Sequence, residues 1–370
     1  MPEKGVSVAD PASVHSQPAT TRDVLRQAIE QRAFPGAAWG VLHKGKIIAR
    51  EALGRFTYAA DAPSVLPGTV FDLASVSKVV ATTAAAMALA DRGLFHLDAR
   101  VGDILPGFVI GMEPGSGKER VTLRMLLAHT SGLIGYAPLF RSCSTPDTLL
   151  RAILRLPLQA KPGERTEYSD FGYILLGKII EILSGETLDV FCSREIFAPL
   201  GMTVTRFRPA ETDRPSIPPT EEDQTFRQRI LRGEVQDEHA FVLDGVAGHA
   251  GVFSNTEDLL RFAQCILDQG RAPNGQQVFC PETVEQFATR QGSGRALGWD
   301  VPTENSSSGH HFGPRSIGHL GYAGTSLWID PDQHLAVVLL TNRTWPDRST
   351  DAIRQVRPVF HDGVVESLRA

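Results

Sequence analysis

The chain has 370 residues and lacks several features that would place a protein in a class at once. No apolar run approaches the ~18 residues of a membrane-spanning helix, so we expect no such span. Basic residues are not in excess: 37 Lys and Arg face 42 Asp and Glu, whereas nucleic-acid-binding proteins usually carry a basic surplus. What remains is a composition with 42% hydrophobic and 21% charged residues, typical of a packed core rather than of disorder.

Cysteine is also scarce, and its spacing points to no metal site. The four cysteines form no C-x-x-C pair and do not lie beside histidine at zinc-finger spacing. Asp237 and His239 could begin a metal site, but no third ligand follows at a suitable distance. We therefore expect no metal and no cofactor, and isolated thiols, or two disulfides if the protein is exported. The four are Cys143, Cys192, Cys265 and Cys280.

The first twenty residues contain no apolar stretch typical of a secretory signal. They are rich in Pro, Ser and Ala, which predicts a mobile tail over residues 1–20. The sequence as written is therefore expected to be cytoplasmic, and periplasmic or secreted if a leader has been removed.

Two predicted β-hairpins lie near opposite ends of the chain. Residues 37–43 and 47–53 flank a Lys-Gly-Lys turn, and residues 325–329 and 335–341 flank Asp-Pro-Asp-Gln. No strand–helix–strand alternation lies between them, which disfavours a doubly wound parallel fold. The pattern predicts an α+β protein (an α/β sandwich) with a mostly antiparallel sheet built from both chain ends.

The middle of the chain is predicted to be helical. An alanine-rich helix is expected over residues 79–92, where small side chains favour close packing. We expect an α/β domain formed by residues 21–90 and 250–370, with a helix-rich insertion over residues 91–249. Further helices are predicted at 21–33, 123–128, 147–156, 173–183, 188–196 and 256–267.

The sharpest chemical signal is Ser75-Val76-Ser77-Lys78, at the start of the alanine-rich helix. Positions 75 and 78 lie on one helical face, so the two side chains can reach each other. A partly desolvated lysine loses its proton more readily and can accept that of the serine. The alternative is a helix N-cap followed by a solvated lysine.

Two more segments complete a candidate site. Tyr168, in Tyr-Ser-Asp, could relay protons, because nearby ammonium groups would stabilise its ionised form; alternatively its hydroxyl anchors a loop. In Gly-His-Leu-Gly-Tyr, Gly321 would let a ligand approach the strand closely. The backbone N–H of Tyr322, with that of Ser75, would then form an oxyanion hole.

The order and spacing of these motifs resemble the serine β-lactamase and penicillin-binding-protein superfamily over roughly residues 25–345. The similarity is closest to the class C-like branch, which also holds family VIII esterases, D-aminopeptidases and peptidoglycan amidases. It implies that the active site lies in a cleft between the sheet and the helical region, with Ser75, Lys78 and Tyr168 as catalytic residues. Four strings carry the resemblance: 71–75 (FDLAS), 126–133 (LLAHTSGL), 168–173 (YSDFGY) and 245–251 (GVAGHAG).

This chain departs from the β-lactamase pattern at two points. Those enzymes usually have Lys-Thr-Gly where this chain has His319-Leu320-Gly, so both usual donors to a substrate carboxylate are missing. Asp170 stands where class C enzymes usually have asparagine, and could pair with Lys78 or with a substrate amine. Both changes favour neutral esters or amides, or substrates with an amine, over penicillins.

Weaker candidates for substrate binding are Tyr136 and His249. Tyr136 belongs to the apolar segment 133–140, which either receives an acyl chain or packs in the core. His249 lies in the glycine-rich run and either points into the site or is a hydrogen-bonded structural residue.

The leading hypothesis is a serine hydrolase that acts through an acyl-enzyme on a small-molecule ester or amide, most simply an esterase. The alternatives are a D-amino-acid peptidase or peptidoglycan-fragment amidase, then a β-lactamase. A non-catalytic relative that binds a peptide or glycan is the alternative of another class. An α/β-hydrolase is disfavoured, because no G-x-S-x-G elbow occurs.

Overall fold

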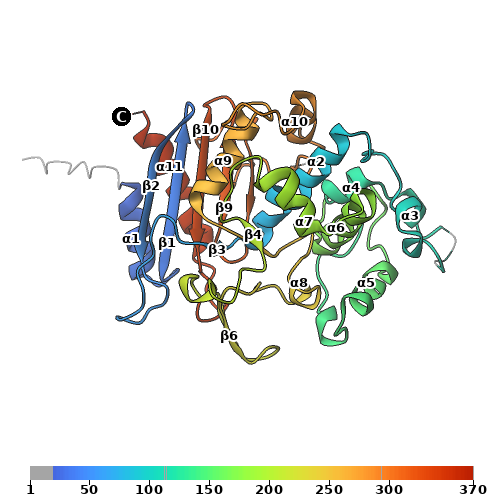
Figure 1. Cartoon of the computed structure of the whole chain (residues 1–370), viewed down its shortest axis with the longest axis horizontal. Coiled ribbons are helices and arrows are strands. Elements are labelled where there is room, and N and C mark those ends of the chain that lie inside the picture. The colour runs from blue at the N-terminus through green and yellow to red at the C-terminus, as the bar shows by residue number, and fades with distance from the viewer. Residues whose placement is uncertain (1–19, 112, 114, 293, 370) are drawn as a thin grey trace, which may run out of the picture.

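The structure is a computed structural model that describes residues 20–369 except 112, 114 and 293. Residues 1–19 of the predicted tail therefore lie outside the described residues. Thr20 begins the described chain as the N-cap of helix α1 (Thr21–Glu30), where its hydroxyl accepts a hydrogen bond from the backbone of Asp23. Figure 1 shows a sheet with its covering helices at one end of the molecule and a group of helices at the other.

A five-stranded antiparallel sheet is formed by both ends of the chain, as the sequence predicted. The two hairpins meet where β1 pairs with β10, with Ala37 opposite Thr341 and His43 opposite Leu335. The strands lie in the order β2 (Lys46–Gly54), β1 (Gly36–His43), β10 (Leu335–Thr341), β9 (Ser326–Asp330) and β8 (Ile317–Leu320).

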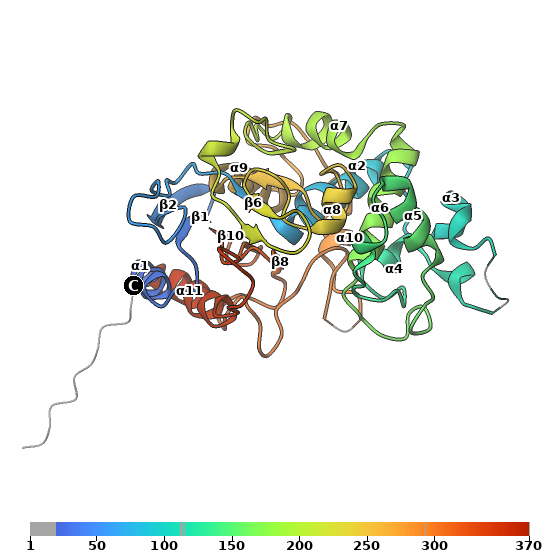
Figure 2. The same cartoon turned by 90° about the horizontal axis from the view of Figure 1, so that it is seen from below.

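Helices cover both faces of this sheet. Helices α1 and α11 (Ile353–Ser367) lie on one side, and α9 (Thr256–Leu267) lies on the other (Figure 2). Successive residues of a strand point to opposite faces. Accordingly, Val337 and Leu339 pack with α1 and α11, whereas Val338 and Leu340 join the larger core. Strands β1, β9 and β10 are therefore buried on both sides, which explains why they are almost continuously apolar.

The rest of the chain is mostly helical. The remaining helices are α2 (Ala84–Asp91), α3 (Val101–Ile104), α4 (Leu123–Leu127), α5 (Pro146–Arg155), α6 (Asp170–Ser184), α7 (Leu188–Cys192), α8 (Glu238–Val242) and α10 (Pro281–Ala288). Short strands are β3 (Phe71–Asp72), β7 (Val252–Ser254) and β4 (Arg206–Phe207) in one sheet, and β5 (Glu221–Asp223) and β6 (Arg229–Leu231) in another. The described chain contains no helix with the length and apolarity to cross a bilayer.

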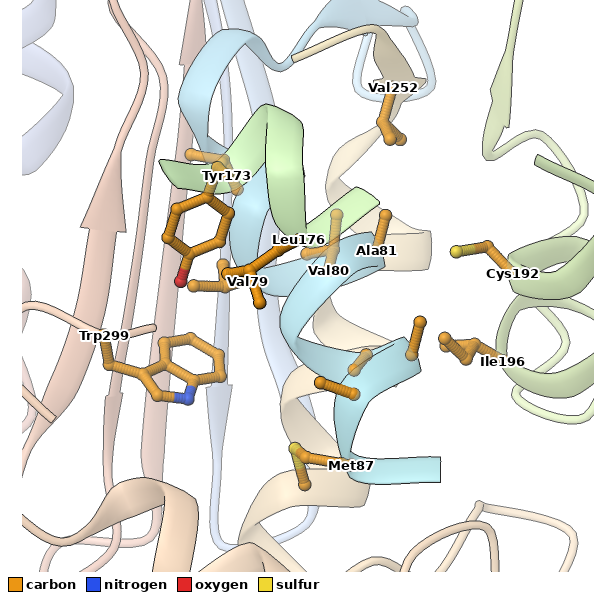
Figure 3. Packing of buried hydrophobic residues seen from close by; sticks show 14 of the residues in the cluster. Val79, Val80, Ala81, Met87, Tyr173, Leu176, Cys192, Ile196, Val252 and Trp299 are labelled. Carbon is orange, nitrogen blue, oxygen red and sulfur yellow. The ribbon is translucent and has the colours of Figure 1, made fainter. Parts of the chain in front are cut away.

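The alanine-rich helix differs from its prediction at its start. A 3₁₀ turn (Ala74–Val76) leads into a π-helical stretch (Lys78–Thr83), and the regular α-helix begins only at Ala84. Figure 3 shows this segment packed among buried side chains that include Leu176 and Trp299. The division into an α/β domain and an insertion over residues 91–249 stays a prediction.

The core position Leu339 tests the sheet packing. We expect Leu339→Ala to lower the free energy of unfolding by about 2–5 kcal/mol, because the cavity adds to the lost burial. Ile48→Ala in β2 is the control, since Ile48 is half exposed and its loss should cost less than about 1 kcal/mol. Urea unfolding of both variants measures the difference, and equal losses would contradict the described burial of β10.

Candidate active site

Ser75 lies in a tight turn that directly follows strand β3. Ala74, just before it, has a φ of 47°, a left-handed conformation that is strained for a residue with a side chain. Asp72 holds this turn: Oδ1 accepts a hydrogen bond from the Ala74 N–H, and Oδ2 accepts one from the Gln236 N–H, each at 2.8 Å. Burial raises the pKa of Asp72 to about 6 against the opposing effect of these two N–H groups. The strained turn therefore depends on a buried carboxylate.

Lys78 lies beneath Ser75 and is completely buried. Its Nζ is 2.8 Å from Ser75 Oγ, 2.7 Å from Asp170 Oδ1 and 3.0 Å from the carbonyl oxygen of His249. Asp170 reaches Lys78 because it begins helix α6, which Ser169 caps by accepting the Gly172 N–H. The structure thus joins Ser75 and Lys78 in direct contact.

The three partners of Lys78 differ in what they can offer. Asp170 and the His249 carbonyl only accept hydrogen bonds, whereas the Ser75 hydroxyl can donate or accept. A neutral amine has two hydrogens and one lone pair. With both hydrogens directed to the two obligate acceptors, the lone pair faces Ser75 Oγ. The geometry therefore suits an amine that removes the hydroxyl proton of Ser75.

Tyr168 approaches Ser75 from another side. Its hydroxyl donates a hydrogen bond to Ser75 Oγ at 2.8 Å. Burial, reinforced by the negative charge of Asp170, raises the pKa of Tyr168 well above its usual value, although Lys78 Nζ lies 4.9 Å from the ring centre. The prediction that nearby ammonium groups stabilise the phenolate is therefore wrong. The phenol is therefore neutral and donates its hydrogen bond to Ser75 Oγ.

His129 fixes the position of Tyr168, a contact that the sequence did not reveal. Its ring stacks on Tyr168 with centroids 4.6 Å apart and on Tyr173 with centroids 5.1 Å apart. Its Nδ1 accepts the Ser169 N–H at 3.0 Å, and its backbone has a left-handed φ of 57°. Burial, with the charges of Arg295 and Lys78, lowers the pKa of His129 well below the usual value. His129 belongs to the string Leu-Leu-Ala-His-Thr-Ser-Gly, one of the four that carry the family resemblance, and that membership is the feature of the sequence that could have indicated its role.

His319 occupies the third motif, in strand β8. Its Nδ1 lies 2.8 Å from the carbonyl oxygen of Leu320, which can only accept, so Nδ1 carries the hydrogen and Nε2 is an acceptor. Burial lowers its pKa to about 4, so the ring is neutral at pH 7. Within the described chain, Nε2 is buried without a partner. The third motif therefore supplies no cation for a substrate carboxylate.

Gly321 lines the cleft and also packs against the nucleophile turn. A Cβ at this position would clash with the carbonyl oxygen of Leu73 and with Oγ1 of Thr325, which itself donates to Leu73 at 2.8 Å. This packing gives a second reason for glycine at position 321, and close approach of a ligand there stays a prediction. The 321–325 turn packs directly on Leu73, two residues before Ser75, and so brings Tyr322 close to the nucleophile turn. The pairing of the Ser75 and Tyr322 N–H groups as an oxyanion hole stays a prediction.

Of the two weaker candidates for substrate binding, Tyr136 lines the cleft, whereas the ring of His249 lies behind it. Tyr136 is half exposed and lines the cleft, with its ring edge-on to His239 at 5.7 Å. His249 offers its carbonyl oxygen to Lys78, while its buried ring binds Asp237 through Nε2 at 2.7 Å. The ring of His249 therefore stabilises the chain behind the cleft. The metal candidate Asp237 is engaged in this hydrogen bond and as the N-cap of α8.

One cleft of about 980 Å³ collects most of these groups. From the predicted set, Ser75, Tyr168, Asp170, Tyr136, His319, Gly321 and Tyr322 line it. Many charged residues that the sequence motifs did not indicate also line this cleft. They are Asp237, Glu238, Asp300, Asp351, Arg295, Arg343, Arg348, Arg354 and Arg357.

A comparison with family models matches residues 21–359 to the family described as Beta-lactamase. The chain belongs to the β-lactamase family. It is 33% identical over 335 residues to an Escherichia coli K12 protein named "Putative D-alanyl-D-alanine carboxypeptidase", covering 83% of this chain and 74% of the relative. It is also 33% identical over 345 residues to a Bacillus subtilis N-acetylmuramyl-L-alanine amidase, covering 84% and 77%.

Solved structures show the same fold. The hydrolase EstCE1, described as having promiscuous acyltransferase activity, is 23% identical and superposes with a TM-score of 0.74 over 93% of this chain and 97% of its own. A class C β-lactamase from Rhodobacter sphaeroides is 21% identical, with a TM-score of 0.73 over 94% and 99%. The chain is a β-lactamase-family serine hydrolase with the predicted α+β fold.

Gly321→Ala tests the contact between the third motif and the nucleophile turn. The added methyl group must push Leu73 and Thr325 away, and displacement of about 1 Å at a reacting group costs roughly 10²-fold in rate. We expect a loss of this size in kcat/KM for p-nitrophenyl butyrate. Gly68→Ala is the control, because a Cβ there meets open space. Activity within threefold of the wild type in a folded Gly321→Ala variant would contradict the described packing.

The neutral state of His319 predicts a pH effect on stability. Its folded pKa of about 4 lies below the unfolded value near 6.5, so the unfolded state binds more protons as the pH falls. The stability that depends on neutral His319 is complete above pH ~6.5 and declines toward pH ~4. His319→Gln cannot titrate, so the stability of the wild type relative to this variant should fall by about 3 kcal/mol between pH 7.5 and 4. Urea unfolding at both pH values measures it, and a constant difference would show that His319 is not neutral by burial.

Proposed function

We propose that this β-lactamase-family hydrolase cleaves carboxylic esters and amides through an acyl-enzyme on Ser75, with Lys78 as the base and Tyr168 as the proton donor. The observation that carries the proposal is the pair of 2.8 Å contacts that Ser75 Oγ makes with Lys78 Nζ and with the Tyr168 hydroxyl. Both partners come from different parts of the chain and meet at one oxygen. That convergence is typical of an activated nucleophile.

In acylation, Lys78 takes the proton of Ser75 while Oγ attacks the substrate carbonyl carbon. The N–H groups of Ser75 and Tyr322 would stabilise the negative oxygen of the tetrahedral intermediate. As that intermediate collapses, the bond to the leaving group breaks and the neutral Tyr168 supplies the proton that the leaving group needs. The proton held by Lys78 then neutralises the phenolate.

In deacylation the same groups transfer protons, and a water molecule takes the place of Ser75 as the nucleophile. Water loses a proton to the Lys78 and Tyr168 pair, its oxygen attacks the acyl carbon, and the proton returns to Ser75 Oγ as the ester bond breaks. The high pKa of Tyr168 suits both halves of the cycle. It keeps the phenol protonated at rest and makes the transient phenolate a strong base.

Short-chain esters are the substrates to try first, because a neutral His319 and Leu320 supply no donor for a β-lactam carboxylate at the third motif. A second candidate, a peptidase or amidase on cell-wall fragments, is favoured by the charged lining of the cleft. The names of the carboxypeptidase and amidase relatives support it as well. A β-lactamase ranks third.

Covalent labelling tests the proposed catalytic residues. We expect a fluorophosphonate probe to label the wild type and not Ser75→Ala, and Lys78→Met and Tyr168→Phe to slow ester hydrolysis by at least about 10²-fold. Tyr58→Phe is a matched control, because Tyr58 binds the Arg32 carbonyl outside the cleft. Folded wild-type protein that neither reacts with the probe nor hydrolyses esters would favour a binding function.

The substrate ranking has its own test. Turnover of p-nitrophenyl butyrate, a D-alanyl amide and a chromogenic cephalosporin is compared at equal enzyme concentration. We expect the ester to be hydrolysed fastest, since the ester carbonyl is the most reactive and needs no anion site. Cephalosporin turnover far above that of the ester would overturn the ranking.

A further inference from the structure

A second pocket, of about 570 Å³, lies next to the catalytic cleft and is separated from it by the segment 233–245. We call this segment the partition and the second pocket the back pocket. Gln236, Asp237 and Glu238 of the partition line the cleft, whereas residues on both sides of these three line the back pocket. Among the described residues, none lines both. The back pocket has the volume of a site for a small molecule.

The inside of the back pocket is aromatic. The rings of Phe140 and Phe226 meet edge to face with centroids 4.9 Å apart, and those of Phe226 and Phe241 do so at 5.9 Å. Phe226 and Phe241 are only partly buried, so each ring keeps surface that a ligand can cover. Burial of an apolar group against these rings would be favourable. The other apolar residues of the lining are Val235, Val242 and Phe253.

A buried ion pair holds the back pocket in shape. Arg227 Nε lies 3.1 Å from Asp223 Oδ2, and both side chains are almost completely buried. Asp223 also accepts the N–H of Phe226 at 2.9 Å. Arg227 Nη1 donates to the carbonyl of Val235 at 2.6 Å, and Nη2 donates to that of Gln236. The aromatic lining and the partition are therefore fixed before a ligand arrives, which lowers the entropic cost of binding.

Three arginines line the back pocket, and two of them are paired with carboxylates. Arg229 donates two hydrogen bonds to Glu234, at 2.9 and 2.7 Å, and Arg208 binds Asp189. Arg214 is the exception. In the part of the chain that the structure describes, its side chain has no hydrogen-bond partner and no carboxylate within 4 Å, and its Nε is buried. The back pocket therefore holds one uncompensated guanidinium group.

A glycine of the partition makes room for Arg214. Gly233 has a φ of 61°, and a Cβ at this position would lie 2.6 Å from Arg214 Cγ. The aliphatic part of Arg214 thus lies directly on the backbone of the partition. A buried guanidinium nitrogen without an acceptor is costly. A carboxylate would supply acceptors, because its two oxygens match the planar guanidinium and receive charge-assisted hydrogen bonds.

We infer that the back pocket binds a small apolar carboxylate, with its apolar part against Phe226 and Phe241 and its carboxylate on Arg214. This site is separate from the catalytic cleft, and the inference does not rest on the proposed hydrolase function. A suitable probe is 4-phenylbutyrate, which joins one aromatic ring to one carboxylate through a short chain. Neither a neutral ligand nor an amine would compensate the charge of Arg214.

Calorimetry with three matched probes tests the chemistry of the ligand. The full-length protein is titrated with 4-phenylbutyrate, with the neutral 4-phenylbutanamide and with the cationic 4-phenylbutylamine. We expect the carboxylate to bind about tenfold more tightly than the amide, because hydrogen bonds to a charged group are the stronger ones. The amine should bind more weakly than the amide.

Variants of the lining locate the site. Arg214→Gln should reduce the preference for the carboxylate about tenfold and leave binding of the amide nearly unchanged, and Arg214→Lys should recover part of the preference. Phe241→Leu should weaken both probes alike. Asp244→Asn should strengthen binding of the carboxylate, because Asp244 is a negative charge in the same lining. Arg354→Gln is the control, since Arg354 is an exposed arginine of the catalytic cleft.

Crystals grown with 4-(4-bromophenyl)butyrate show the position of the ligand through the anomalous signal of bromine. We expect the bromine among the rings of the back pocket and the carboxylate at Arg214. Bromine in the catalytic cleft alone would overturn the inference, as would binding at crystal concentration only, with none by calorimetry. Tighter binding of the amine than of the carboxylate would refute the assigned chemistry. Equal losses for acid and amide in Arg214→Gln, or an equal selective loss in Arg354→Gln, would show that Arg214 does not bind the carboxylate.

Discussion

The buried amine of Lys78 is the constraint on which the rest of the site depends. A lysine without solvent is costly unless its amine has hydrogen-bond partners, and here three separate segments supply them. The nucleophile turn brings Ser75, the first turn of α6 brings Asp170, and the glycine-rich run brings the His249 carbonyl. Gly248 explains why that run is glycine-rich: a Cβ there would clash with the Tyr173 carbonyl of α6. The position of one nitrogen thus determines how three parts of the core pack.

The sequence predicted the parts of the fold and site that follow from local spacing. Hairpins require alternation and a suitable turn, and Lys44 and Gly45 do adopt the left-handed conformation that a tight hairpin turn needs. The Ser75 and Lys78 pair required only a three-residue spacing, which survived although the segment is 3₁₀ and π-helical rather than α-helical. Contacts between segments that are distant in the sequence could not be predicted, because local spacing carries no information about them. Asp72 binds Gln236 across 164 residues, and nothing in the FDLAS string indicates that partner.

Tyr168 shows why the sign of an electrostatic effect requires the structure. The sequence places cations near the phenol and so suggests that its pKa falls. Burial acts in the opposite direction and is larger, and the carboxylate of Asp170 adds to it. The same carboxylate that compensates Lys78 therefore keeps Tyr168 protonated. A single residue at the start of α6 therefore binds the amine directly and helps to raise the pKa of the phenol.

The proposed catalytic groups and the charged cleft wall come from different parts of the chain. Residues 71–78, 168–170 and 245–251 hold the proposed catalytic groups and their partners, whereas the charges of the cleft wall come largely from residues 295–357. The two parts meet most closely at the 321–325 turn, where Gly321 packs on Leu73 and Arg343 and Arg357 hold the carbonyls. Substitutions in the wall can therefore change which substrate fits without moving Ser75, provided that this turn is kept. That separation gives a physical reason why proteins of this fold carry the names of a carboxypeptidase, an amidase, a hydrolase with acyltransferase activity and a β-lactamase.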